Sequence, residues 1–196
     1  VKRGSSETYL KNEQALQEYL INSALNETHI ELNDGSLLTG EALKELLHQI
    51  TLLGDRLNLL SRKFDPLIAE CLAINNLLNQ ESFSANKAPE LLTALSPLNL
   101  GELEPDKTDW EVSALEDTIE FYRFVRGVRI SKMLHRTQAE SPEFVQVNKI
   151  GSALKHLFIG GCTITIKGQN YKLLTPSKLL ALIIDLGKKG LAIQRF

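Results

Sequence analysis

The sequence predicts an α+β fold made of a helical hairpin and small mixed or antiparallel sheets. Between residues 40 and 78, apolar residues recur at steps of three and four, as along one face of a helix. From Trp110 onward the pattern changes to alternation, with the β-branched and aromatic residues typical of strands. Asn33-Asp34-Gly35 is a hairpin signal between two short apolar runs. Helices therefore dominate the first half, and strands are more frequent in the second.

Residues that cap or break helices set the bounds of the predicted helices. Asn12 and Thr39 are good N-caps for the runs that follow them. Pro66 ends the longest helix, because proline cannot continue the hydrogen-bond ladder, and a second helix then forms a helical hairpin or a kinked pair with the first. Pro89 suits the first turn of a shorter helix. Helices are expected over residues 13–25, 40–63, 66–78, 88–95, 141–158 and 176–189.

The predicted strands are short and bounded by turn residues. The first ten residues indicate a strand, a Gly-Ser turn and a return strand. Gly127 separates two Arg-rich segments, which are two strands or one long strand bent at a bulge. A polar loop is expected over residues 79–87. Further strands are expected over residues 28–32, 36–38, 110–115, 119–125, 128–134, 162–167, 171–174 and 190–196.

Composition shifts suggest how the chain is divided into domains. Both ends look like cuts through a sheet, so the chain is expected to be a piece of a larger protein. Residues 96–109 contain two prolines, a glycine and several acids, and form the expected linker. The predicted division has flanking segments 1–25 and 176–196 around a domain 26–175, itself made of a mainly helical part 26–95, the linker, and a strand-rich part 110–175.

Overall charge and composition exclude several classes of partner. The formal net charge is −2, so the whole chain has no electrostatic reason to seek nucleic acid or an anionic membrane. No apolar run approaches the ~20 residues that span a bilayer. Cys71 and Cys162 form no disulfide framework, which suits a reducing cytosol. A cytoplasmic protein without a membrane partner is expected.

Motifs for catalysis, phosphate binding and metal binding are missing from the sequence. There is no P-loop, no dinucleotide-binding glycine motif and no nucleophile elbow. The four histidines are scattered and lack the spacing of zinc ligands. We therefore expect no catalytic, cofactor-binding or metal-binding residue in this chain.

One cationic pattern is a candidate DNA contact. Arginine with interleaved aromatic residues can form a nucleic-acid surface. The alternative is an amphipathic sheet whose arginines reach water or pair with acids such as Glu116 and Glu120. The near-zero net charge favours the alternative. Strand alternation predicts Arg123 and Arg129 on one face and Arg126 and Lys132 on the other. The candidates are Arg123, Arg126, Arg129, Lys132 and Arg136.

The helices over residues 40–78 are a second candidate surface. They would dock a partner if their apolar stripe were wider than one core needs. Internal packing is the favoured interpretation, because ordinary core helices show the same pattern.

Both ends of the chain resemble the gyrase B family, the B subunits of the type IIA topoisomerase DNA gyrase. Residues 188–196, Lys-Lys-Gly-Leu-Ala-Ile-Gln-Arg-Phe, are similar to the family segment that leads into its Lys-Gly-Leu-Gly-Glu-Met motif. The opening Val-Lys-Arg-Gly, with Tyr9, resembles the family strand that follows a Pro-Pro-Leu-Tyr run. Residues 40–43, Gly-Glu-Ala-Leu, the Arg-rich strands near 123–129 and the last helix are similar to a large insertion of the Gram-negative type.

The resemblance implies a non-catalytic insertion within the TOPRIM domain of DNA gyrase B. Its flanking segments would be remnants of the parent TOPRIM sheet, which places residues 1–11 close to 190–196. The insertion would brace TOPRIM against gyrase A, the other protein of the enzyme, and support DNA binding and coupling. The A2B2 assembly would supercoil DNA negatively with ATP, while Mg²⁺ and ATP would bind elsewhere in the parent protein. The alternative is an accessory DNA-binding module that uses the Arg-rich strands 121–136.

Overall fold

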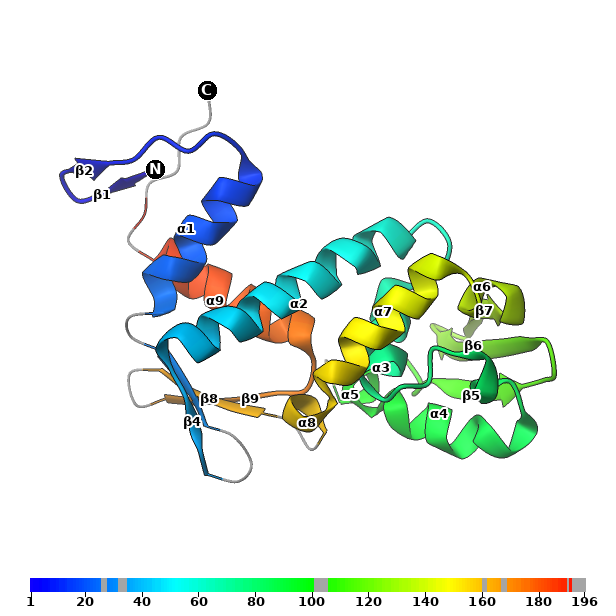
Figure 1. Ribbon diagram of the computed structural model, residues 1–196. Helices are drawn as coiled ribbons and strands as arrows, with labels where there is room; N and C mark the ends of the chain where they lie inside the picture. Colours follow the sequence, from blue (N-terminus) through cyan, green and yellow to red (C-terminus); the bar gives the residue numbers. More distant parts are fainter. Residues whose placement is uncertain are drawn as a thin grey trace. The chain divides into compact units, whose positions relative to one another are not determined.

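The computed structural model has a mixed α/β fold (Figure 1). The residues that the structure describes are 1–25, 28–31, 35–100, 106–159, 162–166, 169–189 and 191. They form two compact units. The first unit combines residues 1–51 with 160–196, and the second comprises residues 52–159. The domain division predicted from the sequence stays a prediction.

The first unit contains a short hairpin, a four-stranded antiparallel sheet and helices. The sheet has the order β4-β3-β8-β9, which brings strands from both halves of the chain side by side. The elements are β1 (Lys2–Arg3), β2 (Ser6–Glu7), α1 (Glu13–Leu25), β3 (Thr28–Glu31), β4 (Leu37–Leu38), β8 (Cys162–Ile166), β9 (Gln169–Leu173) and α9 (Pro176–Lys188). The hairpins and helices predicted for this part of the chain are confirmed.

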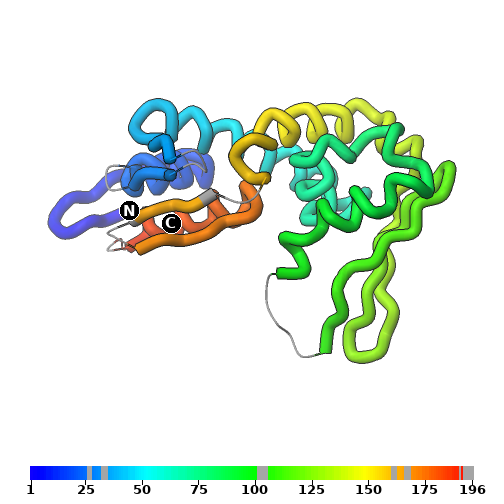
Figure 2. The backbone as a smooth tube through the Cα atoms, turned by 90° about the horizontal axis from the view of Figure 1, so that it is seen from below, coloured from blue at the N-terminus to red at the C-terminus, as the bar shows by residue number. Residues whose placement is uncertain are grey.

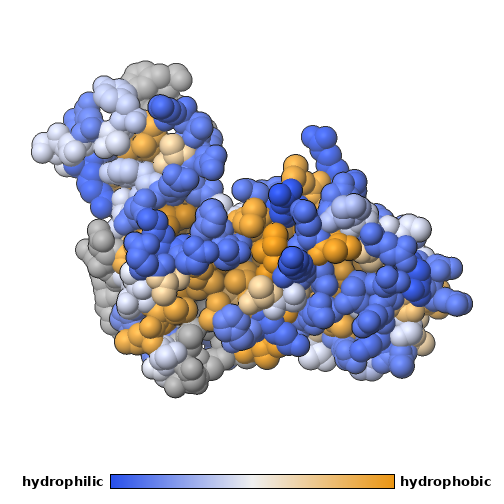
Figure 3. Space-filling view, in the orientation of Figure 1, coloured by the Kyte–Doolittle hydropathy of each residue, from blue (hydrophilic) through white to orange (hydrophobic). Residues whose placement is uncertain are grey.

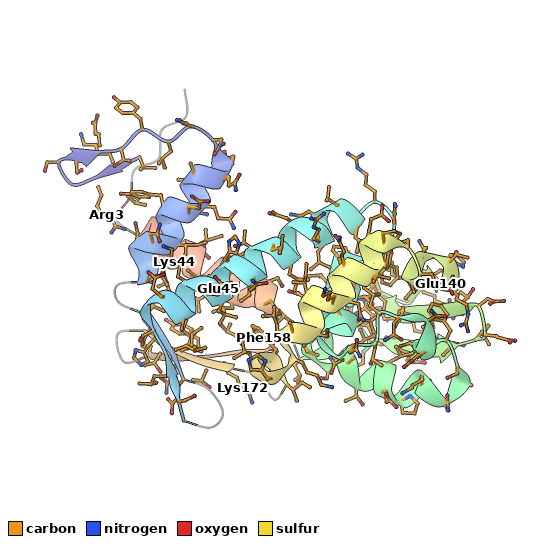
Figure 4. All side chains as sticks on the ribbon, in the orientation of Figure 1. Arg3, Lys44, Glu45, Glu140, Phe158 and Lys172 are labelled. Atoms are coloured by element: carbon orange, nitrogen blue, oxygen red, sulfur yellow. The ribbon has the colours of Figure 1, made fainter. Side chains whose placement is uncertain are left out.

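Close packing of α1 against α9 forms part of the first core. Leu20, Leu179 and Ile183 are buried. Gly187 lies so near Leu20 that a Cβ built on the glycine would be 2.7 Å from the carbonyl carbon of Leu20. The side chain of Arg3, which lies beside the β1–β2 hairpin, donates hydrogen bonds to two carbonyls at the end of α9, those of Gly187 (3.2 Å) and Lys189 (3.5 Å) (Figure 4).

Predictions about the last residues cannot be compared with the structure in full. The strand expected over residues 190–196 lies outside the described residues except for Leu191. The expected closeness of residues 1–11 and 190–196 therefore stays a prediction. The nearest described observation is the pair of Arg3 bonds to the end of α9.

The two helices predicted over residues 40–78 are present, with different ends. The long helix α2 (Gly40–Leu60) stops before the predicted residue 63, and a turn follows. In α3 (Pro66–Ile74), the Asp65 side chain accepts hydrogen bonds from the first backbone N–H groups. α3 ends before residue 78, because Asn76 adopts a left-handed φ of 59° and Leu77 N–H bonds back to Leu72 O at 2.8 Å. This is a Schellman ending, in which the chain reverses.

The second unit places short helices around a three-stranded antiparallel sheet with the order β5-β6-β7 (Figure 2). Two 3₁₀ turns occupy the segment expected to be a loop. The helix expected over 141–158 divides at Leu154 into two. The elements are η1 (Gln80–Ser82), η2 (Ala85–Lys87), α4 (Ala88–Ala94), α5 (Ser96–Asn99), β5 (Glu111–Ala114), β6 (Thr118–Val125), β7 (Val128–His135), α6 (Arg136–Ala139), α7 (Pro142–Ala153) and α8 (Lys155–Phe158).

One face of this sheet belongs to the second core. Ile119, Phe121 and Leu134 are fully buried on it. The ring centroid of Phe121 lies 6.0 Å from that of Phe64, in a tilted arrangement that aromatic pairs favour. The other face carries Tyr122, Arg129 and their neighbours in register, and remains largely accessible.

The two Arg-rich strands form a tight hairpin, and this corrects one prediction. Arg126 and Gly127 make a two-residue turn, with φ of 51° and 75°. In this register Arg123 opposes Ile130, while Arg129 opposes Phe124. The predicted shared face of Arg123 and Arg129 is therefore wrong. The prediction counted alternation along one continuous strand, but a two-residue turn pairs odd positions with even ones.

Candidate nucleic-acid interface

The five candidate cations do not converge on one surface. Arg123 lies on β6, Arg126 in the turn, Arg129 and Lys132 on β7, and Arg136 opens α6. The register puts Arg123 and Lys132 on the same face as the buried Phe121. It puts Arg129 on the opposite face. Over the second unit, the face seen in Figure 3 is mostly hydrophilic, with hydrophobic residues in separate patches.

Arg123 packs against an aromatic ring. Its guanidinium carbon is 4.6 Å from the ring centroid of Trp110, which is only 6% exposed. The backbone N–H of Trp110 donates to Asn99 Oδ1 at 3.0 Å, which ties the chain at Trp110 to the end of α5. Arg123 Nε is buried and has no hydrogen-bond partner among the described residues. This arginine is thus engaged in a cation–π contact within its own unit.

Arg129 belongs to a chain of contacts across all three strands. Its Nη2 lies 3.0 Å from Glu120 Oε1, and its guanidinium lies 4.2 Å from the ring centroid of Tyr122. The Tyr122 hydroxyl donates to Glu111 Oε2 at 2.6 Å. That hydrogen bond raises the pKa of Tyr122 above its ordinary value. The pairing with Glu120 is the one that the amphipathic-sheet interpretation anticipates.

Arg136 fastens the sheet to the turns beside it. Its Nε donates to the Glu116 carbonyl at 2.9 Å, and its Nη2 donates to the Phe83 carbonyl at 3.2 Å. Its Nη1 donates to the Gln80 carbonyl at 3.4 Å. The guanidinium also lies 5.2 Å from the Phe83 ring centroid. The partner at Glu116 is the backbone carbonyl, a role for Arg136 that residue type and spacing in the sequence did not reveal.

Lys132 and Arg126 differ in how far they are engaged. Lys132 Nζ lies 3.8 Å from Asp65 Oδ2, the carboxylate that also caps α3. The Arg126 backbone N–H donates to the Asp106 carbonyl at 2.8 Å. Among the described residues, no hydrogen bond or ion pair is recorded for the exposed Arg126 side chain. Arg126 is therefore the candidate cation most available to a partner.

Charges around the sheet balance. Residues 106–136 contain six Asp or Glu and six Lys or Arg, which gives a formal net charge of zero. Most of the candidate cations are also neutralised or stacked, as described above. A duplex is bound by neutralising several phosphates at once. The sheet as a whole therefore lacks the cationic excess of a nucleic-acid surface.

Two further findings concern the described residues only. They hold no group of three or more His, Cys, Asp or Glu side chains arranged to bind a metal ion. Within the described ranges, no helix is both long and apolar enough to cross a membrane.

Comparison with known proteins relates the whole chain to one part of DNA gyrase B. No family model matches the chain. It is 45% identical over all 196 residues to the B subunit of DNA gyrase from Rickettsia bellii, and 45% identical to that from Rickettsia conorii. The corresponding protein of Caulobacter vibrioides is 23% identical over 194 residues. The chain spans about a quarter of the curated relatives it matches, 24% for the first two.

Proposed function

We propose that the chain is a non-catalytic insertion within the TOPRIM domain of a DNA gyrase B protein. In this role it braces TOPRIM against gyrase A and supports DNA binding and coupling during ATP-dependent negative supercoiling. The observation that carries the proposal is the similarity of the entire chain to one part of gyrase B. The parent assembly would be A2B2, in the cytoplasm.

The first unit supports the idea of an insertion. It combines residues 1–51 with residues 160–196, so the fold brings segments from both ends of the chain into one compact body. The Arg3 bonds to the end of α9 tie the first hairpin to the last helix. An inserted segment must leave and re-enter its parent domain at neighbouring points, which such an arrangement allows.

The chemistry of supercoiling would reside elsewhere in the parent protein. The described residues offer no acidic cluster suited to Mg²⁺. The sequence has no P-loop to hold the phosphates of ATP. We therefore assign no catalytic step to this chain, and its contribution consists of contacts and geometry.

An accessory DNA-binding module is the second candidate function. Arg126 and the half-exposed Arg129 favour it, because both present guanidinium groups at the surface. The engagement of the other three cations disfavours it. A salt titration of duplex DNA against the fragment tests this candidate. Each neutralised phosphate would steepen the loss of affinity by ~0.9 log units per log unit of salt.

Deleting residues 26–175 from intact gyrase B tests the main proposal. We expect the loss of supercoiling to be much greater than the loss of ATP hydrolysis by isolated gyrase B, because ATP would be bound outside the segment. A short flexible linker should join the cut ends, and circular dichroism should confirm that the remainder folds. Unchanged supercoiling in the deletion variant would contradict the bracing and coupling role.

A further inference from the structure

The turn of the β6–β7 hairpin holds a residue type that the turn itself disfavours. In a two-residue hairpin turn both central residues have positive φ, for which Asn, Asp and Gly are preferred. Gly127 meets this preference, but Arg126 adopts a φ of 51° although it carries a full side chain. Backbone strain of this kind persists where the surrounding structure enforces it, and it is concentrated at functional sites.

Neighbouring hydrogen bonds hold the turn in place. Arg126 N–H donates to the Asp106 carbonyl at 2.8 Å, and Thr108 N–H donates to the Phe124 carbonyl at 2.9 Å. Thr108 Oγ1 accepts a hydrogen bond from Phe124 N–H at 2.9 Å. The end of the hairpin therefore projects as a braced element, and Figure 2 shows it clear of the helices of its unit. Such preorganisation reduces the entropy lost on binding.

Exposed apolar side chains lie next to Arg126 along the hairpin, on both of its faces. We call residues 124–130 the hairpin tip. Val128 is 64% exposed and Ile130 37% exposed, and the register places both on one face. Phe124 is 38% exposed on the other face. Arginine and aromatic residues are enriched at the centres of protein interfaces, and the fully buried centre of an interface is more apolar than the rest of a protein surface.

We propose that the hairpin tip docks into a protein surface that offers an apolar recess flanked by a carboxylate. The recess would take Val128 and Ile130, and the carboxylate would pair with Arg126, the cation that has no recorded partner among the described residues. A nucleic acid fits less well, because residues 106–136 have zero net charge and Arg126 alone neutralises one phosphate. The inference rests on the proposed function in one respect: gyrase A is the partner to be tested.

Arg126→Asn in intact gyrase B is the sharpest test. Asparagine suits the left-handed backbone, so this variant removes the guanidinium and keeps the turn. A second variant, Val128→Thr, keeps the β-branched shape and removes apolar surface. Arg62→Asn is the matched control, because Arg62 is also an exposed arginine of the second unit but lies outside the hairpin tip. Its neighbour Lys63 accepts a hydrogen bond from Gln138, which follows the end of β7. Affinity for gyrase A is measured by calorimetric titration at fixed salt, and affinity for duplex DNA by anisotropy.

We expect Arg126→Asn to weaken binding of gyrase A by about tenfold, a larger loss than most interface residues give. Val128→Thr should weaken it about threefold to tenfold, and Arg62→Asn less than twofold. The melting temperature of Arg126→Asn should be unchanged or higher. Unchanged affinity of both tip variants for gyrase A would overturn the inference. A second result would also overturn it: the tip variants lose as much affinity for duplex DNA as for gyrase A, and the slope of log DNA affinity against log salt becomes smaller by about one. That result would assign the tip to nucleic acid.

The deletion of residues 26–175 separates this inference from the proposed function. If deletion impairs supercoiling while both tip variants bind gyrase A normally, the docking inference fails and the proposed function stands. If deletion leaves supercoiling unchanged, the proposed function fails whatever the tip variants do.

Discussion

Gly151 of α7 lies in direct contact with Ala73 of α3: a Cβ built on Gly151 would be 2.6 Å from the Ala73 Cβ and 2.8 Å from its carbonyl carbon. Alanine normally favours a helix over glycine by about 1 kcal/mol. Here the overlap involves backbone, which must move to relieve it. We expect Gly151→Ala to lower the free energy of unfolding by about 1–3 kcal/mol. Urea unfolding followed by Trp110 fluorescence measures this, because Trp110 is the sole tryptophan.

Gly54 of α2 provides the control for the Gly151 contact. A Cβ built on Gly54 would meet no described atom within 4 Å. Gly54→Ala should therefore raise the free energy of unfolding by about 0.5–1 kcal/mol through helix propensity alone. A stabilising effect of both substitutions would contradict the close approach of α7 to α3 at Gly151.

Local chemistry made much of the fold predictable. The sequence signal Asn33-Asp34-Gly35 correctly predicted that β3 and β4 pair as antiparallel neighbours, and Pro66 marked the start of α3, where its missing N–H costs nothing. The changed period after Trp110 correctly predicted strands. These features act between near neighbours in the chain. The predicted helix ends were less accurate. α3 ends where Asn76 adopts the left-handed conformation, and the general preference of asparagine for that conformation does not predict where along the chain it occurs.

The candidate site was harder to predict, because it depends on contacts between distant residues. Spacing identified the five cations, but it could not show that Arg123 stacks on Trp110 or that Arg136 binds the carbonyls of Gln80 and Phe83. These partners lie 13 to 56 residues away in sequence. The two-residue turn also placed Arg123 and Arg129 on opposite faces, although alternation had predicted one shared face. The cationic pattern in the sequence thus identified the candidate residues. Tertiary contacts determined which of them can bind a partner.

Arg136→Met should destabilise the second unit, whereas Arg126→Asn should not. Arg136 donates to the carbonyls of Glu116, Gln80 and Phe83, and a Met side chain of similar length can donate to none of them. The expected loss is about 2 kcal/mol in the free energy of unfolding, since hydrogen bonds from charged groups are the stronger ones. Arg136→Lys should recover only part of the lost free energy of unfolding, because an ammonium group lacks the planar fork of donors that a guanidinium has. Equal stability of Arg136→Met and the unaltered protein would contradict the anchoring role.

The Lys63–Glu143 pair predicts a pH effect in the acidic range. The hydrogen bond from Lys63 Nζ, 2.9 Å from Glu143 Oε1, lowers the pKa of Glu143, with a further contribution from the Lys63 charge. Because the folded-state pKa is the lower one, the unfolded chain binds more protons between the two values. The pair therefore stabilises the fold above the unfolded pKa, near 4.3, and the contribution is lost as pH falls through the folded pKa. In Lys63→Met, an NMR titration of the Glu143 carboxyl carbon should give a pKa closer to the ordinary value. An unchanged titration would show that Lys63 does not cause the shift.

Arg3→Met should loosen the first hairpin without unfolding the first unit. The Arg3 guanidinium binds the Gly187 and Lys189 carbonyls, where a helix end leaves carbonyls unpaired and favours a cation. β1 and β2 pair only two residues each, and so short a hairpin is marginal by itself. We expect faster hydrogen exchange at Thr8, whose N–H bonds to the Val1 carbonyl at 2.8 Å, and a change in global stability below about 1 kcal/mol. Lys2→Met is the matched control, because it removes only the exposed ion pair of Lys2 with Glu7. Equal exchange at Thr8 in the Arg3 and Lys2 variants would mean that the bonds to α9 do not hold the hairpin.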